Sequence, residues 1–111
     1  MYLLILNWDL SDKPKEIFEQ LRKYIAEESW KRYEHKNGLV QKIWYSNVES
    51  GQFGGIYLWE TKEAMEEEIR TMYRVKVITG VDPAIKKFDV EAIQEGDHSM
   101  ENLTSVGLAW K

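Results

Sequence analysis

Residues 39–60, LVQKIWYSNVESGQFGGIYLWE, decide the fold of this chain. Residues 39–48 are rich in β-branched and aromatic side chains and contain no glycine or proline, which is typical of a strand. ESGQ then forms a turn, and a second strand begins around Phe53. Because so short a turn joins the two strands, we expect an antiparallel hairpin, with a bulge or a close backbone approach at Gly54 and Gly55.

Upstream of the hairpin, the sequence predicts a helix of about four turns. It starts at SDKP, where Ser11 or Asp12 can cap it and Pro14 fits the first turn. It ends at EHKNG, where Gly38 can adopt a left-handed conformation. Apolar side chains recur at three- and four-residue steps and form one stripe along it. The stripe consists of Ile17, Phe18, Leu21, Tyr24 and Ile25.

Downstream of the hairpin, the sequence predicts a second helix. Thr61 caps it, and the helix dipole favours Glu63 in its first turn. The helix stops at Gly80, and Pro83 prevents any continuation. Its apolar stripe consists of Ala64, Met65, Ile69, Met72, Tyr73 and Val77.

Two further strands complete the order β-α-β-β-α-β. They are residues 2–8 (YLLILNW) and residues 84–90 (AIKKFDV). Two right-handed crossovers then generate a four-stranded antiparallel sheet with both helices on one face, a ferredoxin-like α+β fold. We expect residues 1–91 to form this domain and residues 92–111 to form a C-terminal tail. The tail is either frayed or docked on the partner or over the pocket through Leu108 and Trp110.

The strands are apolar on both faces, which predicts a homodimer. YLLIL and IYLW carry apolar side chains at both parities, yet two helices cover only one face of the sheet. A flat apolar face in water exceeds what monomers usually expose. A second copy of the same sheet is the simplest cover, so we expect a homodimer through the sheet face.

Composition excludes several classes of function. The chain has 111 residues, the size of one domain, and its net charge of −4 argues against non-specific nucleic-acid binding. The first residues, MYLLILNWD, are too short to cross a bilayer and lack the features of a leader, so we expect no membrane association. The absence of cysteine excludes disulfides and thiol chemistry and agrees with a cytoplasmic protein.

The hairpin also carries a resemblance to a known family. The stretch from Gly38 to Val90 resembles the YdhR-like mono-oxygenases of the dimeric α/β-barrel superfamily. The segments that carry the resemblance are GLVQKIW, the turn, GGIYLWETKEA and KFDV. The resemblance implies a ferredoxin-like dimer, as the patterning does. It also implies a reaction, because relatives oxidise polycyclic aromatic substrates with dioxygen and without metal or flavin.

We therefore expect a cofactor-independent mono-oxygenase that acts on a small aromatic or quinol-type substrate in a pocket between sheet and helices. The alternative is a non-catalytic dimeric module that binds a small apolar or aromatic ligand or supports assembly. Polar groups inside the pocket distinguish the two, because the enzyme needs a proton acceptor or an oxyanion donor there.

Asn7 is the candidate catalytic residue. By resemblance, it stands where haem-degrading and antibiotic-type relatives place a pocket asparagine on the first strand. The alternative is an asparagine that bonds to backbone groups at the strand end. If Asn7 faces the pocket, alternation divides the strand into two faces. Leu3, Ile5 and Asn7 then face the helices, and Leu4, Leu6 and Trp8 face the dimer partner.

Three aromatic residues on the hairpin are candidates for the substrate pocket. Tyr57 and Trp59 share one face of their strand, and Trp44 lies on the neighbouring strand. Aromatic rings on strands also serve as core or interface, so that alternative stays open.

Metal and haem sites are not expected. His35 and His98 lack the spacing of a metal site. Haem-degrading relatives carry a Trp and a haem-ligating His on the second helix, where this chain aligns Glu68 and Ile78. We therefore expect no metal and no cofactor. The run Glu66 to Glu68 could hold a general base, but at helical spacing the three carboxylates spread over the outer face, so a solvated surface is the favoured interpretation.

Overall fold

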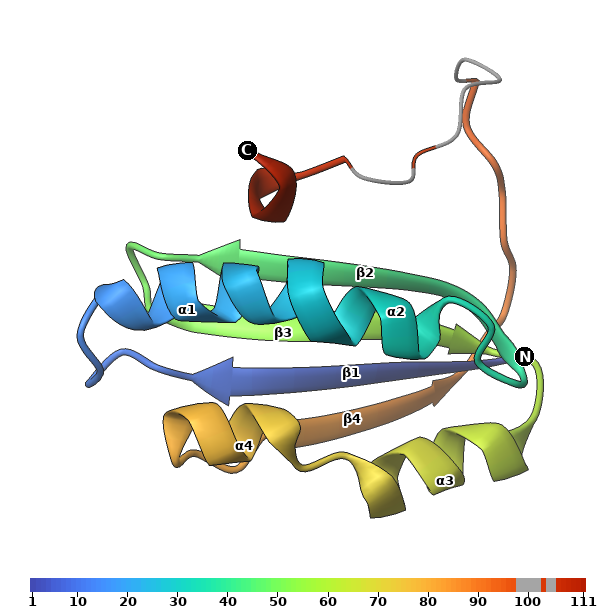
Figure 1. The fold of residues 1–111 in the computed structure, drawn as a ribbon. Coiled ribbons are helices and arrows are strands. Elements are labelled where there is room, and N and C mark those ends of the chain that lie inside the picture. Colours follow the sequence, from blue (N-terminus) through green and yellow to red (C-terminus); the bar gives the residue numbers. More distant parts are fainter. Residues whose placement is uncertain (98–102, 104–105) are drawn as a thin grey trace.

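The computed structural model describes residues 1–97, 103 and 106–111, and its centre is a four-stranded antiparallel sheet (Figure 1). The spatial order of the strands is β2-β3-β1-β4, as expected for a ferredoxin-like fold. The strands are β1 (Tyr2–Asp9), β2 (Leu39–Asn47), β3 (Gln52–Trp59) and β4 (Ala84–Asp89). The predicted hairpin is confirmed as β2 and β3, and its register shifts between Leu39 and Gln41.

The first helical segment lies on one face of this sheet. It consists of α1 (Glu16–Tyr24), the π-helical turn η1 (Ile25–Ser29) and α2 (Trp30–Tyr33). The predicted cap is wrong, because neither Ser11 nor Asp12 caps α1. The backbone N–H of Ser11 instead donates to the Asp9 carboxylate over 3.0 Å. A short turn therefore precedes the helix, which begins only after Lys15.

The second helical segment covers the same face but is broken in two. α3 (Lys62–Thr71) begins as predicted, with the Ala64 N–H donating to the Thr61 hydroxyl over 3.1 Å. Met72 is extended, and α4 (Arg74–Thr79) follows and ends at Gly80 with a φ of 75°. The break overturns part of the predicted apolar stripe, since Tyr73 and Val77 are 56% and 75% exposed.

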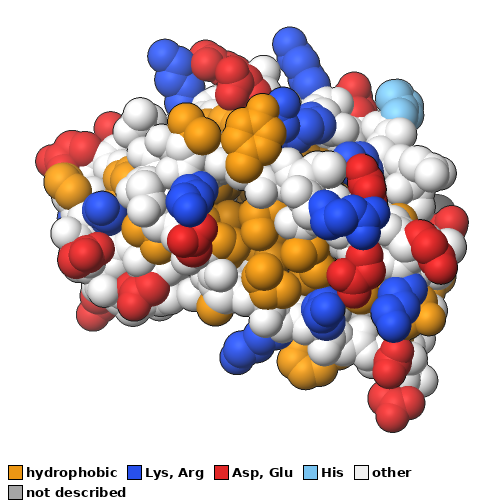
Figure 2. Space-filling view, turned by 90° about the horizontal axis from the view of Figure 1, so that it is seen from below, with side chains coloured by type: hydrophobic (Ala, Val, Ile, Leu, Met, Phe, Trp, Pro, Cys, Tyr) orange, Lys and Arg blue, Asp and Glu red, His pale blue; other side chains and the backbone are white. Residues whose placement is uncertain are grey.

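Charged and apolar side chains are mixed on the side of α3, α4 and β4. Figure 2 shows hydrophobic side chains near the centre of this surface, with Lys, Arg, Asp and Glu side chains around them. Two ion pairs on this side link neighbouring elements: Lys76 with Asp82 at 2.8 Å and Lys87 with Glu66 at 3.2 Å. Such exposed pairs contribute little to stability, so burial of the apolar face holds the helices on the sheet.

The two faces of β1 are the reverse of our prediction. Leu4 and Leu6 are fully buried under the helices, and Trp8 packs against Phe53 with their rings 6.3 Å apart. Asn7 therefore lies on the opposite face, together with the other odd-numbered residues of the strand. The physical reason is that the larger apolar side chains fill the core, while the amide keeps hydrogen-bond partners at the open face.

The tail is partly docked. The short turn η2 (Leu108–Trp110) near its end lies beside α1 and η1 (Figure 1). The Trp110 ring packs edge-on against Trp30 at 5.2 Å, whereas Leu108 is 54% exposed. No helix among the described residues is long and apolar enough to cross a membrane.

Candidate functional site

A cavity of about 320 Å³ lies between the sheet and the helical segments. The break between α3 and α4 borders it, as does the end of the first helical segment. The strands contribute Trp8, Lys42, Trp44, Phe53, Gly55 and Tyr57. The helices contribute Tyr24, Ser29, Arg32, Tyr33, Glu68 and Val75, and the break between α3 and α4 contributes Met72. The cavity thus combines aromatic walls with a few charged groups, as ligand sites commonly do.

Two of the three predicted pocket residues border the cavity. Trp44 and Tyr57 line it, but Trp59 does not. Trp59 is fully buried behind Tyr57, on which its ring stacks at 5.9 Å with 10° between the planes. The indole N–H of Trp44 donates to the Ser29 hydroxyl over 3.2 Å. Ser29 is positioned by η1, and such π-helical turns often occur at functional sites.

Asn7 does not reach this cavity. Its amide donates to the Gln52 side chain over 2.7 Å and accepts from the Tyr45 hydroxyl over 2.6 Å. Gln52 in turn donates to Asp9 over 3.2 Å, so these side chains form a polar cluster on the open face. The expectation that Asn7 acts in a pocket under the helices is therefore corrected.

Lys42 is the basic group at the centre of the aromatic walls. Its Nζ lies 3.4 Å from the centre of the Tyr33 ring and 4.4 Å from the centres of the Trp44 and Tyr57 rings. Ring faces attract an ammonium group, so the three rings form a cage around it. Within the part of the chain that the structure describes, this Nζ makes neither a hydrogen bond nor an ion pair.

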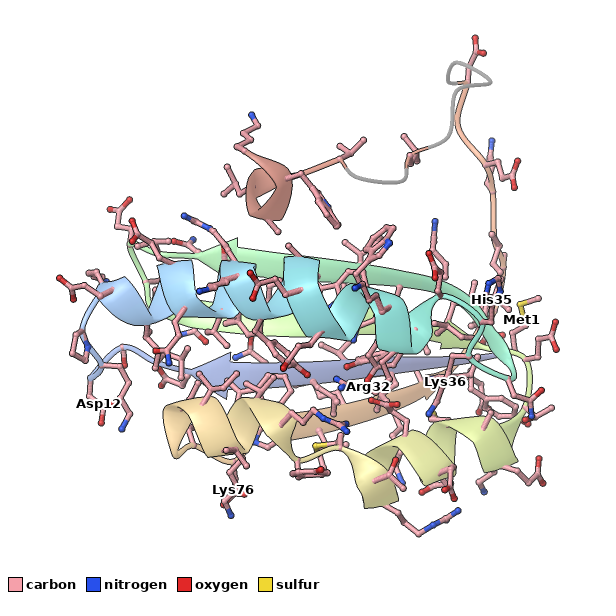
Figure 3. All side chains as sticks on the ribbon, viewed as in Figure 1. Met1, Asp12, Arg32, His35, Lys36 and Lys76 are labelled. Carbon is pink, nitrogen blue, oxygen red and sulfur yellow. The ribbon has the colours of Figure 1, made fainter. Side chains whose placement is uncertain are left out.

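Charges around the cage set the protonation of Lys42. Burial lowers the pKa of Lys42 well below its ordinary value, and the nearby charges of Arg32 and Lys36 lower it further. The Glu68 carboxylate acts in the opposite direction. Figure 3 shows Arg32 and Lys36 on the side of α2 that faces α3. Lys42 consequently releases its proton more readily than an exposed lysine.

Glu68 is the acidic group of the site. It is only 2% exposed and accepts a hydrogen bond from the Tyr33 hydroxyl. Burial and then the Glu68 charge raise the pKa of Tyr33. Burial also raises the pKa of Tyr57 well above its ordinary value. Both phenols therefore stay protonated at neutral pH and act as hydrogen-bond donors.

The interpretation of the glutamate run as a solvated surface is wrong for one member. Glu66 and Glu67 pair with Lys87 and Arg70 at the surface, but Glu68 turns inward. A signal was available, because Glu68 follows the buried Met65 by three residues and so shares its face of α3. The signal for Lys42 in the sequence was weaker. Alternation along the strand places Lys42 on the same face as Trp44, a predicted pocket residue.

The described residues hold no cluster typical of a metal site. Among residues 1–97, 103 and 106–111, no three His, Cys, Asp or Glu side chains lie close enough together to bind a metal ion. His35 is exposed, as predicted for a surface residue, and His98 lies outside the described residues.

Comparison with known proteins identifies a family that the sequence matches. The sequence matches a family model described as "Putative mono-oxygenase ydhR" over residues 4–97. No curated protein matches the chain.

Three solved structures share the fold at low sequence identity. A "putative antibiotic biosynthesis monooxygenase" from Deinococcus radiodurans has a TM-score of 0.60 and 18% identity, over 87% of this chain and 100% of that chain. The monooxygenase of ActVA-Orf6 from Streptomyces coelicolor, in complex with nanaomycin D, has a TM-score of 0.64 and 7% identity, over 86% of this chain and 92% of that chain. A dimeric ferredoxin-like protein from an uncultured marine organism has a TM-score of 0.53 and 15% identity, over 88% of this chain and 100% of that chain. Since the family model spans most of the sequence, the chain belongs to the family described as "Putative mono-oxygenase ydhR".

Proposed function

We propose that this protein is a mono-oxygenase that binds a small aromatic or quinol-type substrate in the cavity between sheet and helices and needs no cofactor. The observation that carries the proposal is the cavity itself, with rings on several sides and one unpaired lysine among them. Family membership supports the same class of reaction.

The cavity limits the size of the substrate. Its volume of about 320 Å³ is roughly twice the ~150 Å³ of an engineered cavity that binds benzene. One or two fused rings therefore fit in the cavity that Trp44 and Tyr57 line. Offset or edge-on contacts with these rings hold an aromatic molecule in a fixed plane.

The reaction requires only the substrate and dioxygen. A substrate SH₂ reacts with O₂ to give SO and H₂O, so one oxygen atom enters the product and the other leaves as water. The substrate loses two hydrogens and supplies the electrons. The protein holds the ring, excludes bulk water and stabilises the anion that forms when the substrate loses a proton.

The same proposal includes a second copy of the chain on the open face of the sheet. Ile43 of β2 and Phe88 of β4 are 50% and 49% exposed on that face. Leu3, Ile5, Ile56 and Leu58 lie between them. A second sheet would cover this apolar surface and form a homodimer. The similarity to a dimeric ferredoxin-like protein supports this arrangement.

Oxygen uptake tests the activity. We expect the purified protein, free of visible absorption bands, to consume one O₂ per molecule of a hydroxynaphthalene, hydroquinone or anthrone without releasing hydrogen peroxide. With ¹⁸O₂, one labelled atom should appear in the product. No uptake with any of these compounds would contradict the proposal and favour the non-catalytic ligand-binding module.

A matched pair of variants places the reaction in the cavity. Val75→Trp fills the cavity from α4 and should lower kcat/KM at least about tenfold, because the ring displaces the substrate. Val77→Trp puts the same side chain on the exposed side of α4 and should leave kcat/KM unchanged. Equal activity of both variants would place the reaction elsewhere.

A further inference from the structure

Lys42 is half-buried, and its amine has unusual surroundings. It projects from β2 opposite Tyr57, and three aromatic rings surround its Nζ at 3.4 to 4.4 Å. An ammonium group has three N–H donors, and burying it without acceptors is costly. The described part of the chain supplies no acceptor for any of them.

The groups that face Lys42 explain why no internal partner forms. From α3, the Glu68 carboxylate is already engaged by the hydroxyl of Tyr33. From α2 and the loop after it, Arg32 and Lys36 bring like charge. From β3, Tyr57 offers a protonated hydroxyl and an aromatic ring. A molecule bound in the cavity that Lys42 lines can supply the acceptor that the described residues do not.

We propose that Lys42 is the base of this site and that its substrates are hydroxyaromatic compounds, of the phenol, naphthol or hydroquinone class. This inference rests on the proposed function, since it takes the cavity as the substrate site. The substrate O–H bond breaks, its electron pair stays on oxygen, and the proton forms a new N–H bond on Lys42. The products of this step are a bound aryl oxide anion and a lysine ammonium.

The surroundings stabilise both products of that proton transfer. The three ring faces attract the newly formed cation, and the Glu68 carboxylate favours it electrostatically. The aryl oxide supplies the acceptor that the ammonium lacked, and a hydrogen bond between two charged partners is stronger than one between neutral groups. A ring with an ionisable hydroxyl is thereby preferred over the same ring without one.

A spectroscopic titration under argon tests this role without turnover. The probe is 4-nitrophenol, whose phenolate absorbs visible light and whose phenol does not. Below the pKa of the free phenol, we expect the native protein to bind it as phenolate, with its ionisation constant raised at least about tenfold. Calorimetry in two buffers of different ionisation enthalpy should find no proton released, because Lys42 takes it up.

Two variants assign the effect to Lys42. Lys42→Met has a similar length and fits the aromatic cage but cannot accept a proton, so the phenolate band should disappear. Lys31→Met makes the same change at an exposed position of α2 and should keep the band. A phenolate band in Lys42→Met equal to that of the native protein would overturn the inference. So would release of one proton per bound phenol, or absence of binding.

A measurement on the native protein covers the case that Lys42→Met does not fold. In protein labelled with ¹³C at the lysine Cε, the Lys42 signal should titrate at lower pH than the exposed lysines. Titration together with them would overturn the inference. A protein that ionises 4-nitrophenol but consumes no O₂ with any substrate would contradict the proposed function and leave the role of Lys42 intact.

Discussion

At the scale of single residues, the cavity combines a basic group, an acidic group and a phenol. These are Lys42, Glu68 and Tyr33. The Glu68 carboxylate is buried with one hydroxyl donor from Tyr33. Lys42 lies against the ring of that same tyrosine, at 3.4 Å from its centre. Tyr33 therefore contacts both the acidic and the basic group, and within the described residues these two groups form no ion pair. An amine held in this way remains available to a bound molecule.

The first prediction concerns folding stability and pH. The native pKa of Lys42 is lowered by burial, so between that value and the unfolded value of about 10.4 the unfolded chain binds more protons. The free energy of unfolding should therefore rise with pH across this window. Lys42→Met should lose this rise and Lys31→Met should keep it. Urea unfolding at a series of pH values measures the free energy of unfolding. An equal dependence of that free energy on pH in both variants would contradict the prediction.

At the scale of elements, Gly54 allows β3 to lie very close to its neighbour β1. Gly54 faces the open side, where the hydroxyl of Tyr45 crosses the strand to reach Asn7. A Cβ built on Gly54 would lie 2.2 Å from the carbonyl oxygen of Leu6 and 2.4 Å from that hydroxyl. The strand thus approaches its neighbour more closely than any side chain permits.

The second prediction concerns this close approach. Gly54→Ala should lower the free energy of unfolding by about 1–3 kcal/mol, because the backbone of β1 must shift and the bond between Tyr45 and Asn7 is strained. Gly96→Ala is the control, since a Cβ there meets no atom within 4 Å. That change should stay within about 0.5 kcal/mol. Urea unfolding compares the two, and a Gly54→Ala protein as stable as the control would contradict the close contact.

At the scale of the whole molecule, the two faces of the sheet differ in what covers them. One face carries the helices and the cavity, and the other carries exposed apolar side chains such as Ile43 and Phe88. The polar cluster around Asn7 lies at one end of that open face. In the proposed dimer, the cluster would fix how the two sheets are aligned, because buried polar groups must keep their partners.

The third prediction concerns that dimer. Sedimentation equilibrium should find a dimer at micromolar concentration, and the interface should bury at least about 1,600 Å² in total. Ile43→Lys should weaken association at least about tenfold, since two-fold symmetry places the new charge twice in an apolar interface. Val77→Lys, on the exposed side of α4, should leave it unchanged. A native monomer, or a dimer that tolerates Ile43→Lys, would contradict the prediction.

Local patterns were enough to predict the order of elements. The hairpin, the cap at Thr61 and the stop at Gly80 depend on residues close together in sequence, and the structure confirms them. The α+β ferredoxin-like fold and the family follow from the same stretch, residues 38–90. Turn chemistry and hydrophobic periodicity depend only on residues that are close together along the chain. A single sequence is therefore enough to predict which segments form helices, strands and turns.

The faces of the sheet and the polar groups of the site depended on tertiary packing. Both parities of β1 are apolar, so alternation defines two faces without saying which one the helices cover. Packing buried Leu4, Leu6 and Trp8 and left Asn7 on the open side. The same packing brought Lys42 and Glu68 to one cavity from β2 and α3, because their distance depends on how a helix lies across a sheet rather than on spacing along the chain.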